Sequence, residues 1–227
     1  MFSHLTQKKC PLCSRLSSRL KKLFRQFYYI GIDCQGIHLS SYDSKQRVAK
    51  INTIAPSCTC EEFRMSKYSS KPVGGSEILA RFIFSPMHIK KGRLLPSVFS
   101  HVHSIGCSVQ RESIATTDEL VGFAHKFLSA KNDRVWKGVL LAKCDDLRNI
   151  KTEDTSNRLI CIYDTAERDN PAHGEMGQTQ YIIEEADQNE LRSKLFTAFD
   201  EGKIIDPNAY RDGAIWCKLQ PDLKTRI

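Results

Sequence analysis

Apolar residues along the chain follow two periods, and together they predict an α+β fold. The 3.6-residue period of an amphipathic helix is clear at residues 117–128 and 187–199. Runs of strand length occur at residues 135–143, 159–163, 108–111 and 181–183. We therefore expect a small mixed sheet with two main helices.

The remaining apolar segments are shorter and allow fewer assignments. Residues 76–84 begin with a Ser-Glu helix cap and precede Pro86, so they predict a short helix, with a strand as the alternative. Nearer the N-terminus, three short strands are predicted, at residues 28–32, 37–42 and 48–54.

A polar stretch at residues 66–76, with Pro72 and two glycines, predicts a boundary in the chain. It separates a basic N-terminal module, residues 1–72, from an α+β domain, residues 73–227. Residues 1–72 hold 13 Lys+Arg against 4 Asp+Glu, a balance of +9, out of a net +8 for the whole chain. A basic module on a near-neutral body indicates an anionic partner such as nucleic acid, or else a solvated arm.

Residues 8–28 predict a basic amphipathic helix within that module. Its apolar positions, from Leu12 to Phe27, recur at helical spacing with five cations between them. Such a helix, residues 12–27, could lie on a phosphate backbone, an anionic membrane surface or a protein partner, or it could pack on its own domain.

The nine cysteines, an odd and scattered set in 227 residues, predict reduced thiols and a cytoplasmic protein. No apolar run reaches the roughly 20 residues that span a bilayer, and no clean secretory signal begins the chain. Cys10 and Cys13 have the spacing of a zinc knuckle, and Cys58 and Cys60 are the second pair that a tetrahedral zinc site needs. Otherwise these four cysteines are free thiols.

Several short motifs follow one another in a recognisable order from residue 77 onward. They are Glu77-Ile78-Leu79-Ala80-Arg81, Pro96-Ser97-Val98-Phe99, Ser108-Val109-Gln110-Arg111, the strand at residues 137–143, Asp164 after a strand, Pro171-Ala172-His173 and the helix near residues 188–199. Their order resembles a family of small bacterial α+β proteins without an established activity, over residues 76–200 only. The resemblance implies that residues 76–200 form one unit in which Arg81, Arg111 and His173 belong together.

These three residues, if they converge, suit a phosphate-bearing substrate. Two guanidiniums form a fork for phosphate, and a histidine beside them transfers a proton near neutral pH. Ser108, His101 and His103 are then candidate substrate-binding residues.

Two alternatives compete with that site. In a metal-dependent phosphodiesterase, His101 and His103 would share a metal with Asp164, His173 and Glu175. In a purely structural reading, the arginines pair with nearby carboxylates and the histidines have no role.

Two functions therefore remain open. One is a nucleic-acid-associated bacterial protein that acts on phosphate through Arg81, Arg111 and His173, with residues 1–72 holding the strand. The other is a non-catalytic subunit or adaptor of a larger bacterial complex, for example one for antiviral defence, in which the arginines and the histidine are structural.

Overall fold

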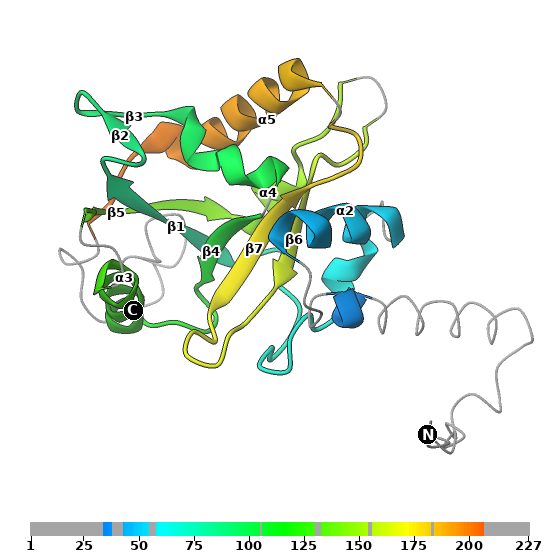
Figure 1. Cartoon of the computed structure of the whole chain (residues 1–227), viewed down its shortest axis with the longest axis horizontal. Helices are drawn as coiled ribbons and strands as arrows, with labels where there is room; N and C mark the ends of the chain where they lie inside the picture. The colour runs from blue at the N-terminus through cyan, green and yellow to red at the C-terminus, as the bar shows by residue number, and fades with distance from the viewer. Residues whose placement is uncertain are drawn as a thin grey trace, which may run out of the picture.

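The computed structural model describes residues 34–37, 43–54, 58–104, 106–129, 133–153, 156–182 and 184–206. Its centre is a five-stranded sheet in the order β5-β1-β4-β7-β6 (Figure 1). The strands are β1 (Ile78–Ser85), β4 (Cys107–Arg111), β5 (Val135–Lys143), β6 (Ile160–Asp164) and β7 (His173–Gln178). The α+β class is confirmed, but all four pairings are antiparallel, so the sheet is not mixed.

The other elements surround this sheet. The helices are α2 (Ser44–Ile54), α3 (Thr117–Ser129), α4 (Cys144–Arg148) and α5 (Glu185–Ala198), and the 3-10 segments are η2 (Thr59–Glu62), η3 (Pro96–His103) and η4 (Asp200–Gly202). Strands β2 (Ile89–Lys90) and β3 (Arg93–Leu94) form a separate hairpin.

The two predicted main helices are confirmed as α3 and α5, and both begin with a reciprocal cap. The Thr116 hydroxyl accepts from the Glu119 amide while Glu119 accepts from the Thr116 amide. Glu184 and Asp187 repeat this arrangement at the start of α5. Such capping boxes satisfy amides that a helix leaves without partners.

Three predicted elements are wrong. Residues 76–84 do not form the expected helix; β1 (Ile78–Ser85) is the strand given as the alternative, because it lies inside the sheet between β5 and β4. Residues 48–54 belong to helix α2 instead of a strand, and Tyr181 lies in a turn and Ile182 outside any helix or strand. The predicted strand at residues 28–32 lies outside the described part of the chain, as do residues 38–42 of the strand predicted at 37–42, whereas Ile37 is helical.

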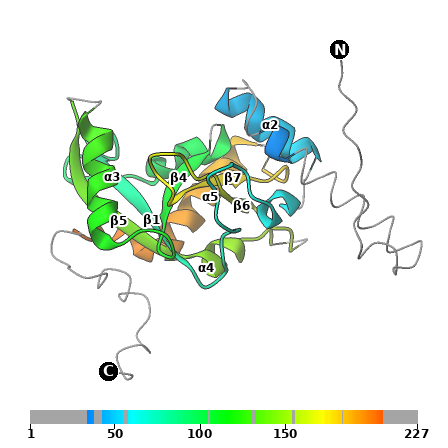
Figure 2. The ribbon, with the colours of Figure 1, turned by 90° about the horizontal axis from the view of Figure 1, so that it is seen from below.

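Each face of the sheet packs against different elements. One face forms the main core with η3 and α5, where Phe99 and Phe199 stack at 5.0 Å between ring centroids. On the other face α3 covers β5 and β1 through Leu120, and α2 packs near β6 through Ile51. Figure 2 shows α3 and α2 at opposite ends of the sheet, with β4 and β7 between them.

Residues 58–72 pack directly on β6 of the body. A disulfide joins Cys58 to Cys161, and another joins Cys34 to Cys60. The expectation of reduced thiols is therefore wrong for these four cysteines, whose sulfurs are brought together in one buried cluster. No helix among the described residues is long and apolar enough to cross a membrane.

Candidate functional site

Arg111 is fully buried, and each nitrogen of its guanidinium has a partner. Its Nη2 and Nε donate to the two carboxylate oxygens of Glu77 at 2.8 and 3.1 Å. Its Nη1 lies 3.0 Å from Asp164 Oδ2 and donates to the Lys71 carbonyl, while Nη2 also reaches the Pro72 carbonyl. Arg111 therefore ties three segments of the chain together and has no group left for a phosphate.

The pKa values in this network agree with a permanent ion pair. Burial raises the pKa of Glu77, but hydrogen bonds from Arg111, the Gly74 amide and Ser113 together lower it by more. The pKa of Glu77 therefore lies below its ordinary value. Burial lowers the pKa of Arg111, and contact with Glu77 and Asp164 raises it by more, so its pKa is raised. Both groups are charged at neutral pH.

Arg81 is also used for structure. It is 8% exposed, and its Nη1 and Nη2 donate to the carbonyls of Ser108 and Val98 at 2.9 and 3.2 Å. These bonds fix η3 against strands β1 and β4. The predicted phosphate fork is thus occupied at both arginines by groups of the protein itself.

His173 lies on the opposite face of the sheet from the two arginines. It pairs with Gln110, which pairs with Ala80, whereas Arg111 pairs with Leu79. Because successive residues of a strand point to opposite faces, the sheet separates His173 from Arg81 and Arg111. The grouping of these three residues in one site is not formed.

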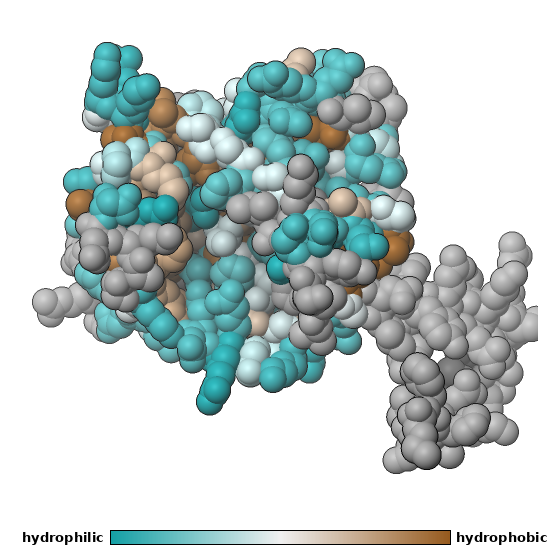
Figure 3. Space-filling view, viewed as in Figure 1, coloured by the Kyte–Doolittle hydropathy of each residue, from teal (hydrophilic) through white to brown (hydrophobic). Residues whose placement is uncertain are grey.

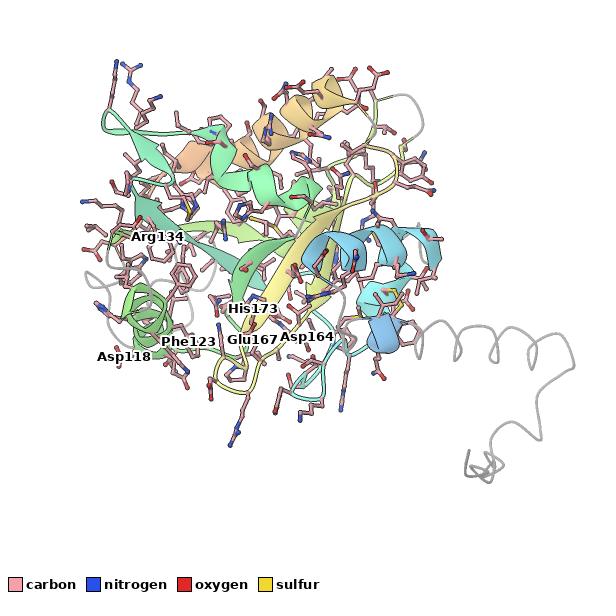
Figure 4. The ribbon with its side chains drawn as sticks, viewed as in Figure 1. Asp118, Phe123, Arg134, Asp164, Glu167 and His173 are labelled. Carbon is pink, nitrogen blue, oxygen red and sulfur yellow. A yellow bond between two sulfur atoms is a disulfide. The ribbon has the colours of Figure 1, made fainter. Side chains whose placement is uncertain are left out.

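The His173 ring is held at the end of β7, near Glu167 (Figure 4). Its Nδ1 lies 2.8 Å from the Thr165 hydroxyl and 3.2 Å from the Thr165 carbonyl oxygen. A carbonyl only accepts, so this contact favours a proton on Nδ1. Burial lowers the pKa of His173, so the ring is neutral at pH 7.

The predicted substrate-binding residues are also spread over the two faces. Ser108 is exposed on β4 opposite Glu175, on the face of His173. His101 and His103 lie in η3, on the other face, where His103 Nδ1 is 2.8 Å from Gln178 Oε1. The alternative metal site, which needs these histidines beside His173, is therefore not formed either.

The predicted zinc ligands are only partly described. Cys10 and Cys13 lie outside the described residues, and Cys58 and Cys60 are in disulfides, which offer no thiolate to a metal. In the described part of the chain, one group of potential ligands has its atoms within 4.8 Å of one another: Cys58, Glu61 and Cys161. The oxidised cysteines do not fit zinc, so zinc remains a prediction for the reduced protein.

Glu61 in that group already serves another purpose. Its carboxylate accepts from Arg148 at 3.0 Å and from Arg158 at 2.6 Å. These ion pairs attach η2 to α4 and to the start of β6. The carboxylate of Glu61 therefore has a structural role in these two ion pairs.

A basic hairpin, made of β2 and β3, has none of these internal partners. Lys91 and Gly92 at its tip have φ angles of 49° and 75°, typical of a two-residue type I′ turn. Lys90, Lys91 and Arg93 are exposed and, with Leu95, line an open depression of the surface. No carboxylate among the described residues forms an ion pair with these three cations.

The buried side chain and the backbone of His88 join the hairpin to β1. His88 is 4% exposed, its Nδ1 accepts from the Phe84 amide at 3.1 Å, and its carbonyl accepts from the Leu95 amide at 3.1 Å. Burial, then the charge of Arg81, lowers the pKa of His88 to about 3. His88 is therefore a neutral structural residue that joins β1 to the hairpin.

The sequence contains a signal for this hairpin in Lys-Lys-Gly-Arg between two apolar residues. No family model, curated protein or solved structure matches the chain. The function is therefore inferred from the contacts of the described residues.

Proposed function

We propose that this is a nucleic-acid-associated protein that contacts the phosphate backbone through the β2–β3 hairpin. The observation that carries the proposal is the set of three exposed cations, Lys90, Lys91 and Arg93, with no carboxylate partner in the described chain. Lysine and arginine on one exposed element, without counter-ions, are typical of a surface that neutralises phosphates.

The geometry of the hairpin supports this proposal. Lys90 and Arg93 are directly opposite each other in the β2–β3 pairing, so their side chains leave the hairpin on the same side. Figure 1 shows the hairpin projecting from the body, free of the main sheet. A two-stranded ribbon of this kind can enter the major groove of a duplex or follow a single strand.

In this proposal Arg81, Arg111 and His173 do not act on phosphate. The arginines stabilise the fold, and the excess charge of residues 1–72 adds a second contact to the nucleic acid. An adaptor of a larger complex shares the structural role of the arginines, but its docking helix, residues 12–27, lies outside the described residues and stays a prediction.

The proposed partner and the disulfides favour different compartments. Nucleic acid favours the cytoplasm, whereas two disulfides favour an oxidising environment. Thiol trapping in intact cells shows whether these cysteines are oxidised or reduced there. The proposal requires that the protein binds nucleic acid in the redox form that the cells contain.

Binding measured against salt tests the proposal. For the full chain, the affinity for a labelled oligonucleotide should fall linearly with the logarithm of salt concentration. The variant Lys90→Ala/Lys91→Ala/Arg93→Ala should bind more weakly, with a slope shallower by about 2 on a single strand and about 3 on a duplex.

A matched variant controls for net charge. Lys71→Ala/Lys151→Ala/Arg168→Ala also removes two lysines and one arginine, all exposed and outside the hairpin. Its affinity should fall much less. Equal losses in the two triple variants would show that the protein binds by net charge and not through the hairpin.

A further inference from the structure

Three exposed apolar side chains lie on segments next to the basic hairpin. Phe127, Val135 and Met87, here called the apolar patch, are 44%, 55% and 38% exposed. They are three of the five large hydrophobic side chains that are exposed in the described chain. Apolar side chains exposed close to one another are candidates for contact with a partner.

The fold places the three patch residues at one end of the sheet. Val135 pairs with Ser85 at the end of β1, and Met87 follows two residues later. Phe127, on α3, stacks on Phe84 with ring centroids 4.9 Å apart. The segments that carry these three residues thus come together where β1 leaves the sheet, with Phe127 on the face that α3 covers.

His88 connects the hairpin to the end of β1, beside which the apolar patch lies. His88 links the end of β1 to β2 and, through the Leu95 amide, to the end of β3. In Figure 3 brown hydrophobic atoms lie directly beside the teal projection at the upper left, which is the position of the hairpin in Figure 1.

A further cation lies within the apolar patch itself. The Arg134 guanidinium is 5.6 Å from the centre of the Phe127 ring, and its charge contributes to lowering the pKa of His88 and His101 after burial and Arg81. Its described carboxylate neighbour is Asp133, with 4.0 Å between Arg134 Nε and Oδ1. The ring of Phe127 and the plane of Arg134 are both surfaces on which a base can stack.

We infer that the hairpin and the apolar patch together bind single-stranded nucleic acid. The hairpin cations hold the backbone while unpaired bases contact Phe127, Arg134 and Met87. Proteins that bind single strands combine a cationic path with aromatic stacking in this way, whereas a duplex keeps its base faces inside. This inference rests on the proposed function and adds the class of nucleic acid to it.

Charge decides between a single strand and a protein as the occupant. Four cations, those of the hairpin and Arg134, lie on the segments next to the three apolar side chains, and Asp133 is the described acidic residue that forms an ion pair with one of these cations. That balance fits a polyanion with apolar faces. A protein partner would have to supply the same acidity around an apolar centre.

The test compares single- and double-stranded oligonucleotides of equal length and sequence on the full chain. Phe127→Leu keeps the apolar volume but removes the aromatic ring. It should weaken single-strand binding about tenfold, with an unchanged salt slope and unchanged duplex binding. Tyr68→Leu and Tyr181→Leu, which remove exposed aromatic rings elsewhere, are the controls and should bind like wild type.

Arg134→Gln is a second variant that does not depend on the stack with Phe84. It should weaken single-strand binding and make the salt slope shallower by about 0.7. Thermal unfolding of both variants verifies that they are folded.

The outcomes separate the two proposals. If the hairpin variant loses affinity for both nucleic acids but Phe127→Leu and Arg134→Gln bind single strands like wild type, the inference is wrong and the proposed function stands. If the wild type binds the duplex more tightly than the single strand, the inference is likewise wrong and the proposed function stands. If the hairpin variant binds like wild type, both proposals fail.

Discussion

The substitution Arg111→Met should destabilise the fold by about 3–5 kcal/mol, because it leaves two buried carboxylates without their cation. Glu77 and Asp164 are 7% and 0% exposed, and Arg111 is the cation that contacts both. Methionine fills a similar apolar volume, so the loss reports the missing charge and hydrogen bonds more than a cavity. The bonds to the Lys71 and Pro72 carbonyls are lost as well.

The assay is urea unfolding of the full chain at several pH values. The pKa of Glu77 lies below its ordinary value of 4.5, since hydrogen bonds led by that of Arg111 outweigh the opposing effect of burial. Stability from a carboxyl with a lowered pKa is present above the ordinary pKa and is lost as pH falls through the folded-state pKa. The gap between wild type and Arg111→Met should therefore shrink below about pH 4.5.

Two comparisons make the result specific. Arg93→Met removes an exposed arginine and should change stability by less than about 0.5 kcal/mol. Glu77→Gln combined with Arg111→Met should cost less than the sum of the single variants, because the two side chains are partners. A loss below about 1 kcal/mol for Arg111→Met would refute the structural role and reopen the anion-binding site.

Three further expectations follow from other parts of the fold. Replacing Cys58 and Cys161 by serine removes a crosslink over 103 residues and should cost about 4–5 kcal/mol in urea unfolding without reductant, whereas no change would mean that the bond does not form. Burial raises the pKa of Glu175 to about 7, so ionisation of Glu175 costs stability as pH rises; Glu175→Gln should be more stable than wild type at pH 8 and equal to it at pH 4. If zinc binds, metal analysis should find it in protein purified under reductant, with a loss in Cys10→Ser and Cys60→Ser; metal-free protein under those conditions would exclude the site.

Sequence periodicity predicts the elements that carry one apolar face. Helices α3 and α5 each have a polar side and a capping box, so both were predictable. Strand β1 is buried on both faces, with Leu79 in one core and Ala80 in another, and shows no alternation. A short apolar run of that kind does not distinguish a helix from a strand.

The candidate site failed for a different reason. Arg81 and Arg111 do lie on one face, but backbone carbonyls hold Arg81 and the carboxylates of Glu77 and Asp164 neutralise Arg111. The side of the sheet on which His173 lies depends on the β4–β7 register, and a shift of one residue would reverse it. Nothing in the local sequence specifies that register, nor the pairing of Cys58 with a cysteine 103 residues away.

The most direct test of the hairpin's role is photocrosslinking of the full chain to a single-stranded oligonucleotide, followed by mass spectrometry of the crosslinked peptides. We expect crosslinks in the peptides that contain Met87 to Leu95 and Phe127 to Val135, and their loss in the variant Lys90→Ala/Lys91→Ala/Arg93→Ala. Crosslinks that fall outside these peptides, at the same sites in wild type and variant, would contradict binding through the hairpin.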